Sequence, residues 1–241
     1  MHTEQYRVGQ QRVASLVVGK DPDRIVPACP AWTASDVVRH LAGVTADVAA
    51  LRFECFGSDG WTETHVASRR HLTVDEVIAE WEASIDDAVA VLDSIETLDL
   101  PERIPSVVGL ISPSVLPAMA LSDLVHHEFD IRNAYGDTTG RDIVEVHANA
   151  AGHARTLRRV FPLYGLPTLR IESTDGGDTW DIGRDEPVAT VRATSFELMR
   201  GIGGRRTRAE MLAWPWTGDG EKFVDAMVLP HLGMPSTSLG E

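Results

Sequence analysis

The sequence predicts an α+β protein: an N-terminal four-helix bundle followed by a smaller α+β domain. Long segments with helical apolar spacing fill the first two thirds of the chain, whereas short β-prone runs separated by turn residues follow. The composition changes at the Pro- and Gly-containing stretch 162–167. We therefore expect residues 1–162 to form the helical bundle and residues 163–241 to form the second domain.

The first two predicted helices flank a proline-containing loop. Apolar residues recur at helical spacing over residues 4–18, and the loop that follows contains three prolines. Thr33 or Ser35 can then cap a helix that passes through His40 toward Phe53. This interpretation places His40 about one and a half turns into the second helix.

Two further helices complete the predicted bundle. The segment 73–95 begins with Thr73 and carries Glu76 three positions later, which is the pattern of a capping box. The fourth helix is expected to begin after Ser112, where proline occupies the first helical position, and to end at Gly136. Four helices of this kind favour a bundle, in which inward side chains from different helices can converge.

The second domain is predicted to contain a small sheet. A fifth helical segment, 144–161, leads to the change in composition, and helices are also expected at 195–204 and within 219–233. Between them, β-prone runs are separated by turn signals such as "DGGD" and "RDEP". The runs that predict strands are 168–174, 179–183 and 189–194.

Charge and cysteine content restrict the possible partners and location. The chain carries 22 basic and 36 acidic residues, a formal charge of −14, which argues against nucleic acid and anionic membranes as partners. The N-terminal residues lack a signal-peptide pattern, and no apolar run approaches the roughly 18 residues of a membrane span. The two cysteines, Cys29 and Cys55, are expected to be free thiols in a reducing compartment. A cytoplasmic location is therefore expected.

The segment 122–132, "SDLVHHEFDIR", suggests a metal site. Asp123 and His127 are four residues apart, with Asp130 three positions further on, so a helix places all three on one stripe. An Asp/His pair together with the distant His40 is the ligand set of an open catalytic zinc site. Asp130, or else Asp36, can orient a ligating imidazole. The alternative is that these histidines only bond to neighbouring aspartates.

Other candidates have weaker patterns. His126 points about 100° away from His127 around the helix, so we expect it to pack or to face solvent. Cys29 lies in a proline-flanked loop, where a structural role is favoured over that of a nucleophile. The arginines of the segment 201–210 follow a glycine-rich turn and can pair with a carboxylate, or the turn is simply a solvated basic segment. The remaining histidines have no comparable pairing; they include His65, His71, His147, His153 and His231.

Three segments together resemble the mycothiol-dependent maleylpyruvate isomerase family. They are residues 26–44, 121–136 and 189–206, and the resemblance extends over nearly the whole chain. Its most specific part is the Cys-Pro-x-Trp-Thr loop at 29–33, which runs into a helix that carries a histidine. The family fold implied is a metal-binding DinB-like bundle followed by a small α+β domain that helps to close the active site.

The resemblance also implies ligands and a cosubstrate. Family ligands fall on His40, Asp123 and His127, holding zinc or another divalent metal, although the family acid is more often glutamate. A family arginine that contacts substrate or thiol falls on Arg205. The implied activity is that of a mycothiol-dependent isomerase or S-transferase acting on a small electrophile that carries a carboxylate.

Two other function classes remain open: a zinc-dependent hydrolase that uses metal-bound water, and a non-catalytic small-molecule or metal-binding protein. A requirement for mycothiol separates the thiol-dependent enzyme from both. The sequence leaves monomer and homodimer equally open.

Overall fold

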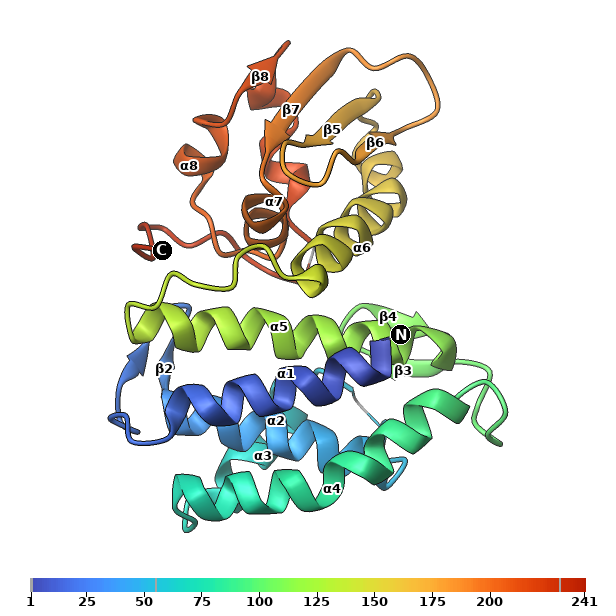
Figure 1. Cartoon of the computed structure of the whole chain (residues 1–241). Helices are drawn as coiled ribbons and strands as arrows, with labels where there is room; N and C mark the ends of the chain where they lie inside the picture. Colours follow the sequence, from blue (N-terminus) through green and yellow to red (C-terminus); the bar gives the residue numbers. More distant parts are fainter. Residues whose placement is uncertain (1, 55, 230) are drawn as a thin grey trace. The chain divides into compact units, whose positions relative to one another are not determined.

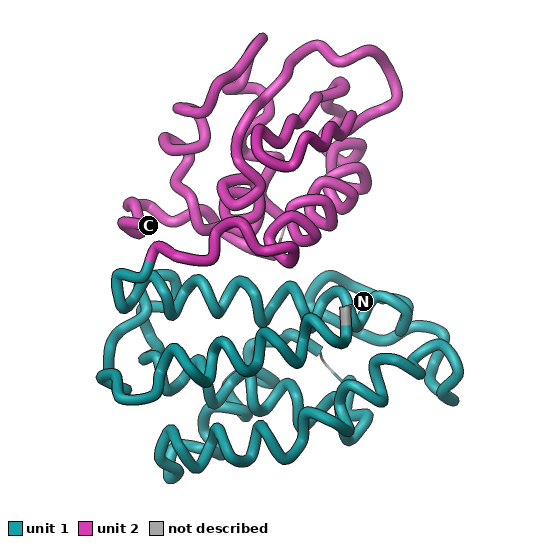
Figure 2. The backbone as a smooth tube through the Cα atoms, in the orientation of Figure 1, with its two compact units in different colours: residues 1–137 teal, residues 138–241 magenta. Residues whose placement is uncertain are grey.

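The computed structural model describes residues 2–54, 56–229 and 231–241, and the chain divides into two compact units (Figure 2). The first unit is Met1–Asp137 and the second is Thr138–Glu241. The predicted division at residues 162/163 is therefore wrong, because the helix α6 (Val144–Val160) packs against α7 (Ser195–Ile202) of the second unit. No helix in the described part of the chain is both long and apolar enough to cross a membrane.

The first unit contains the predicted four-helix bundle (Figure 1). Helix α1 packs against α4 and α5, and α2 packs against the same two helices, which closes the ring of four. The interior is apolar and includes the fully buried side chains of Trp81, Leu41 and Leu124, whose burial is the main stabilising term. The four helices are α1 (His2–Val17), α2 (Ala34–Ala49), α4 (Val74–Ser94) and α5 (Leu116–Ala134).

Three predicted helix boundaries are confirmed, two by capping hydrogen bonds and one by a glycine in the left-handed conformation. The Thr33 side chain caps α2 by accepting from the Asp36 backbone, and the Asp36 carboxylate accepts from the Thr33 backbone. Thr73 and Glu76 form the same reciprocal box at the start of α4. Helix α5 ends just before Gly136, whose φ of +69° is the left-handed conformation that glycine adopts readily. These caps place the site residues on α2 and α5 in defined positions.

The structure also contains a helix that the sequence analysis did not predict, α3 (Asp59–Arg69). The glycines of residues 57–60 suggested only the end of the preceding helix, but the Ser58 side chain accepts from the Trp61 backbone and starts a new one. Two short hairpins complete the unit. They are β1 (Ile25–Val26) with β2 (Cys29–Thr33), and β3 (Ile104–Ser106) with β4 (Gly109–Ile111).

The second unit is built around a four-stranded sheet with the order β6-β5-β7-β8. Strand β5 runs parallel to β7, while the other two pairings are antiparallel. The three predicted strands are confirmed, and buried residues alternate with partly exposed ones along β5 and β7. The strands are β5 (Leu169–Ser173), β6 (Thr179–Ile182), β7 (Ala189–Ala193) and β8 (Trp216–Thr217).

The prediction of a helix within residues 219–233 of the second unit is wrong. The region 219–233 forms two short 3₁₀ turns, Gly220–Lys222 and Val224–Met227, instead of an α-helix. Nearly every residue of 223–229 is buried, so this run has no polar helical face to direct toward solvent. A short helix, α8 (Arg208–Leu212), precedes it.

Candidate metal centre

The three residues predicted as ligands lie together in the first unit, between α2 and α5. His40 on α2 is buried, and its Nε2 lies 3.2 Å from Asp123 Oδ2 on α5. One turn further along α5, His127 places its Nε2 3.6 Å from Asp123 Oδ1. The two imidazole rings are 5.2 Å apart, centroid to centroid. The Asp123 carboxylate thus faces the Nε2 atoms of both histidines.

These separations fit a divalent metal. Two ligand atoms about 2.1 Å from a tetrahedral zinc ion lie about 3.4 Å from each other, and the observed 3.2 and 3.6 Å distances fall on either side of that value. One donor atom from each of the three side chains lies within 4.8 Å of the other two. The Asp123 side chain is 36% exposed, so solvent and small molecules can reach the three candidate ligands from the side of this carboxylate. Nitrogen and carboxylate donors of this kind suit zinc.

Asp130 faces the other edge of the His127 ring. Its Oδ2 lies 3.1 Å from His127 Nδ1, and the Asp130 side chain is completely buried. Burial lowers the pKa of His127, but Asp130, Cys29 and Asp123 together raise it more, to about 10. With a carboxylate on each ring edge, the imidazole holds a proton firmly on Nε2. A metal ion and that proton compete for the same lone pair.

His40 has a different environment. Burial lowers its pKa, and the Asp123 carboxylate offsets only part of this effect. The ring is therefore neutral near pH 7 and carries a lone pair on one nitrogen, as a metal ligand must.

His65, from the unpredicted helix α3, belongs to this cluster. Its Nδ1 lies 3.5 Å from His40 Nδ1, and its Nε2 lies 2.9 Å from Asp47 Oδ2. The sequence-based judgement that His65 has no comparable pairing is therefore wrong. The Ser58 cap signal followed by a helix through Trp61 and His65 was the clue in the sequence that could have revealed it.

Two tryptophans cover the histidines. The Trp32 ring on β2 lies 5.3 Å from the His40 ring and 6.1 Å from the His127 ring. Trp61 on α3 makes an edge contact with His65 at 4.1 Å. Large apolar rings in these positions exclude water from the imidazoles, which strengthens electrostatic interactions inside the cluster.

Cys29 is closer to the site than the sequence suggested. A ligand atom of Cys29 lies within 4.8 Å of those of His127 and Asp130. The thiol therefore lies beside the candidate metal centre, a position that the sequence analysis did not predict. Cys55 lies outside the described residues.

Two alternatives from the sequence do not join the cluster. His126 is buried, but it belongs to neither group of candidate ligands found among the described residues. Asp36 serves the N-terminus of α2 and forms an ion pair with Arg39 at 2.9 Å. Of these two aspartates, Asp130 is therefore the one whose carboxylate lies against a candidate ligand.

Two adjacent arginines of the second unit make different contacts. Arg206 is buried and paired with the carboxylates of Glu197 and Glu241. Arg205 donates to the backbone carbonyl of Gly203 at 2.7 Å. The positive charge of Arg205 lowers the pKa of His153, and only burial lowers that pKa more. Of the two, Arg206 is committed to holding the fold of the unit.

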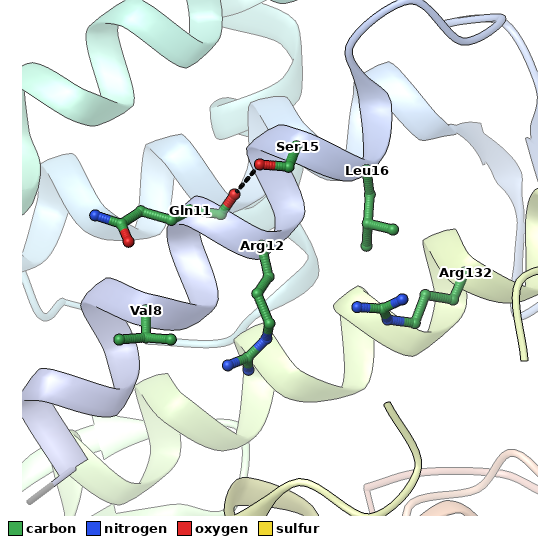
Figure 3. Close-up of a pocket in the computed structure, with 6 residues that line it drawn as sticks. All are labelled: Val8, Gln11, Arg12, Ser15, Leu16 and Arg132. Atoms are coloured by element: carbon green, nitrogen blue, oxygen red, sulfur yellow. Dashed lines mark hydrogen bonds between the residues drawn. The ribbon is translucent and has the colours of Figure 1, made fainter. Parts of the chain in front are cut away.

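A separate hollow of about 330 Å³ lies on the first unit (Figure 3). Arg12 from α1 and Arg132 from α5 extend into it (Figure 3). Both guanidinium groups are paired with the fully buried carboxylate of Glu128. The Glu128 carboxylate explains why the two arginines approach each other here. None of the candidate metal ligands lines the hollow.

Comparisons with known proteins point to one family. The family model described as "Mycothiol maleylpyruvate isomerase N-terminal domain" matches residues 6–132, more than half of the chain. This match includes all three candidate ligands. None of the curated proteins is a significant match.

Two solved structures share the fold. One is the crystal structure of a mycothiol-dependent maleylpyruvate isomerase, which is 15% identical with a TM-score of 0.59 over 85% of this chain and 88% of that one. The other is a histidine-to-alanine variant described in the same words, which is 14% identical with a TM-score of 0.62 over 92% and 94%. The similarity therefore extends across both units.

Proposed function

The chain belongs to the mycothiol maleylpyruvate isomerase family, and we propose that it is a metal- and mycothiol-dependent isomerase or S-transferase. His40, Asp123 and His127 would hold the metal, for which zinc is the best match. The observation that carries the proposal is that both Nε2 atoms approach one carboxylate, at 3.2 and 3.6 Å. A zinc ion held there would lower the pKa of a coordinated thiol and so make mycothiol available as a thiolate near neutral pH.

The chain's own residues supply the remaining requirements. Asp130 fixes the orientation of the His127 ring from behind. Trp32 lies against both histidine rings and keeps water from them. The partly exposed Asp123 leaves room for a thiol to approach. The histidines therefore lie in a dry, rigid part of the bundle, while the reacting molecules enter from the carboxylate side.

The proposed substrate is a small electrophile with a double bond conjugated to a carbonyl, and with a carboxylate. As the thiolate sulfur bonds to one alkene carbon, the π electron pair moves to the carbonyl oxygen as an enolate. Rotation about the resulting C–C single bond, return of the electron pair and departure of the thiolate convert the cis isomer to the trans isomer. In an S-transferase the enolate is instead protonated and the adduct leaves.

Arg205 is the residue proposed to bind the substrate carboxylate or the developing enolate. Arg206 forms ion pairs with Glu197 and Glu241. The charge of Arg205, by contrast, lowers the pKa values of two histidines, His153 and His231. This supports the choice of Arg205 within the adjacent pair.

The test compares the zinc-loaded protein with and without mycothiol, using maleylpyruvate as the first electrophile. We expect turnover only when zinc and mycothiol are both present, and loss of both metal and turnover in His127→Ala. His126→Ala is the matched control and should retain both.

A Co²⁺-loaded sample provides a readout that needs no substrate, because a thiolate bound to cobalt gives a charge-transfer absorption band. Zinc-dependent ester hydrolysis without thiol would instead favour the hydrolase, and metal binding without any thiol band would favour a binding protein.

A further inference from the structure

Glu241 has a carboxylate that joins two arginines of the second unit. The Arg200 guanidinium donates to both of its oxygens, from Nε at 2.9 Å and from Nη2 at 2.5 Å. Arg206 donates from Nη1 to the Oε2 atom of Glu241 at 2.5 Å. All three side chains are buried, and hydrogen bonds between charged groups are the strong ones. Glu241 thus ties the last turn of α7 to a residue six positions further along the chain.

Arg205 lies between the two arginines that Glu241 joins, and both of them hold its backbone. The Arg205 N–H donates to the Arg200 carbonyl at 2.8 Å. The Arg205 carbonyl accepts from Arg206 Nη1 at 3.0 Å, and the same Nη1 group binds Glu241. Both backbone polar groups of Arg205 therefore depend on an arginine that the Glu241 carboxylate fixes.

Glu197 also binds Arg206, but at a different edge of the guanidinium group. Its carboxylate accepts from Arg206 Nε and Nη2, each at 2.7 Å. These contacts hold Arg206 against the first turn of α7, where Glu197 lies. They leave Nη1 to Glu241 and to the Arg205 carbonyl. The contact of Arg206 that reaches the Arg205 backbone is therefore shared with Glu241 and not with Glu197.

The segment 231–241 also packs on the residue before Arg205. Gly204 has a φ of +75°, and a Cβ at this position would lie 2.7 Å from the carbonyl oxygen of Gly233. Only glycine satisfies both the left-handed backbone and this close approach. The turn that carries Arg205 is thus in contact with the same segment that brings Glu241 to the two arginines.

We infer that Glu241 is a positioning residue for Arg205. By joining the two arginines that hold the Arg205 backbone, its carboxylate fixes the turn 203–206. The inference deepens the proposed function, and rests on it, where Arg205 binds the substrate carboxylate. The position of Arg205 itself can be measured without metal, thiol or substrate.

His231 provides that measurement. Partial burial and the charge of Arg205 both lower its pKa. If Arg205 moves away, the pKa of His231 rises. A direct effect of removing the Glu241 charge has the opposite sign, because loss of a nearby negative charge lowers the pKa of an imidazole. NMR titration of the imidazole signals, with His231→Gln to assign the one that belongs to His231, measures the pKa.

The test uses Glu241→Gln, which keeps the shape of the side chain but removes its charge, and Glu241→Ala. Arg205→Ala is the reference for complete loss of the arginine. Glu172→Gln is the matched control, because it breaks the ion pair of Glu172 with Arg192 on the sheet. Circular dichroism and urea unfolding verify that each variant is folded.

We expect the pKa of His231 to rise in Arg205→Ala and in both Glu241 variants, and to keep its wild-type value in Glu172→Gln. Once Arg205 is absent, Glu241→Ala should cause no further rise. An unchanged or lower pKa of His231 in the folded Glu241 variants would overturn the inference.

Turnover provides a second readout. We expect Glu241→Gln to lower kcat/KM about 10- to 100-fold at unchanged metal content, as displacement of a substrate-binding group does, and to have no further effect when combined with Arg205→Ala. Equal losses with and without Arg205 would contradict the positioning role. If the wild-type protein shows no turnover with zinc and mycothiol, the proposed function fails, while the titration of His231 still decides the role of Glu241.

Discussion

Asp130 Oδ2 lies 3.1 Å from His127 Nδ1, on the ring edge opposite to the one that faces Asp123. The completely buried Asp130 carboxylate would therefore act on a bound metal only through the ring of His127. Its removal should weaken metal binding without removing a ligand.

The substitution Asp130→Asn tests this arrangement. The amide keeps a hydrogen-bond acceptor but loses the charge, so we expect zinc affinity to fall about 10- to 100-fold. Competition titration with a chelator measures the change, and circular dichroism verifies the fold. Wild-type affinity in this variant would show that Asp130 does not tune the site.

Zinc affinity should also depend on pH. The pKa of His127 is raised to about 10, so below that pH the metal must displace a proton, and binding tightens as the pH rises. We expect the apparent dissociation constant to fall about tenfold per pH unit near neutrality. Titrations at several pH values in non-chelating buffers measure the slope. A flat profile between pH 6.5 and 8.5 would contradict the protonated His127.

The acid ligand can be lengthened. Asp123 is 36% exposed, so the extra methylene of Asp123→Glu has space, and we expect this variant to bind zinc within about threefold of wild type. Asp123→Ala should lose binding altogether, because two imidazoles alone then remain. Retained binding in Asp123→Ala would exclude Asp123 as a ligand.

The two adjacent arginines should respond differently to truncation. Arg205→Ala is expected to lower turnover by about 100-fold while leaving metal content unchanged. Arg206→Ala removes one of the two arginines that pair with the buried Glu241 carboxylate and leaves Arg200 as the other, so it should lower the free energy of unfolding by about 2 kcal/mol. Turnover, metal analysis and urea unfolding of both variants separate the effects. Full activity in Arg205→Ala would remove it from the proposed mechanism.

His153 on α6 should make the second unit sensitive to acid. Burial and the charge of Arg205 lower its pKa to about 4 from 6.5. Between these values the unfolded chain binds the proton more readily, so stability falls as the pH is lowered from 6.5 to 4, by about 3 kcal/mol in total. Urea unfolding across this range should show a flatter profile in His153→Asn. An identical slope in both proteins would contradict the assignment.

The bundle was predictable because its signals are local. The capping box at Thr73, a cap at Thr33 or Ser35, and apolar periodicity identify the helices without reference to the rest of the chain. The i,i+4 spacing of Asp123 and His127 likewise places them on one face of α5. The helix α3 was missed because its start lies among glycines, where local propensity is weak.

The sequence by itself determined the α+β class, the principal helices and strands, and the stripe of Asp123, His127 and Asp130 on one helix, because each depends on neighbours within a few positions. Only the tertiary structure decided that His40 approaches Asp123, that His65 links His40 to Asp47, and that α6 belongs to the second unit. These relationships depend on which helix faces pack together, and that choice is made by burial of apolar surface over the whole chain.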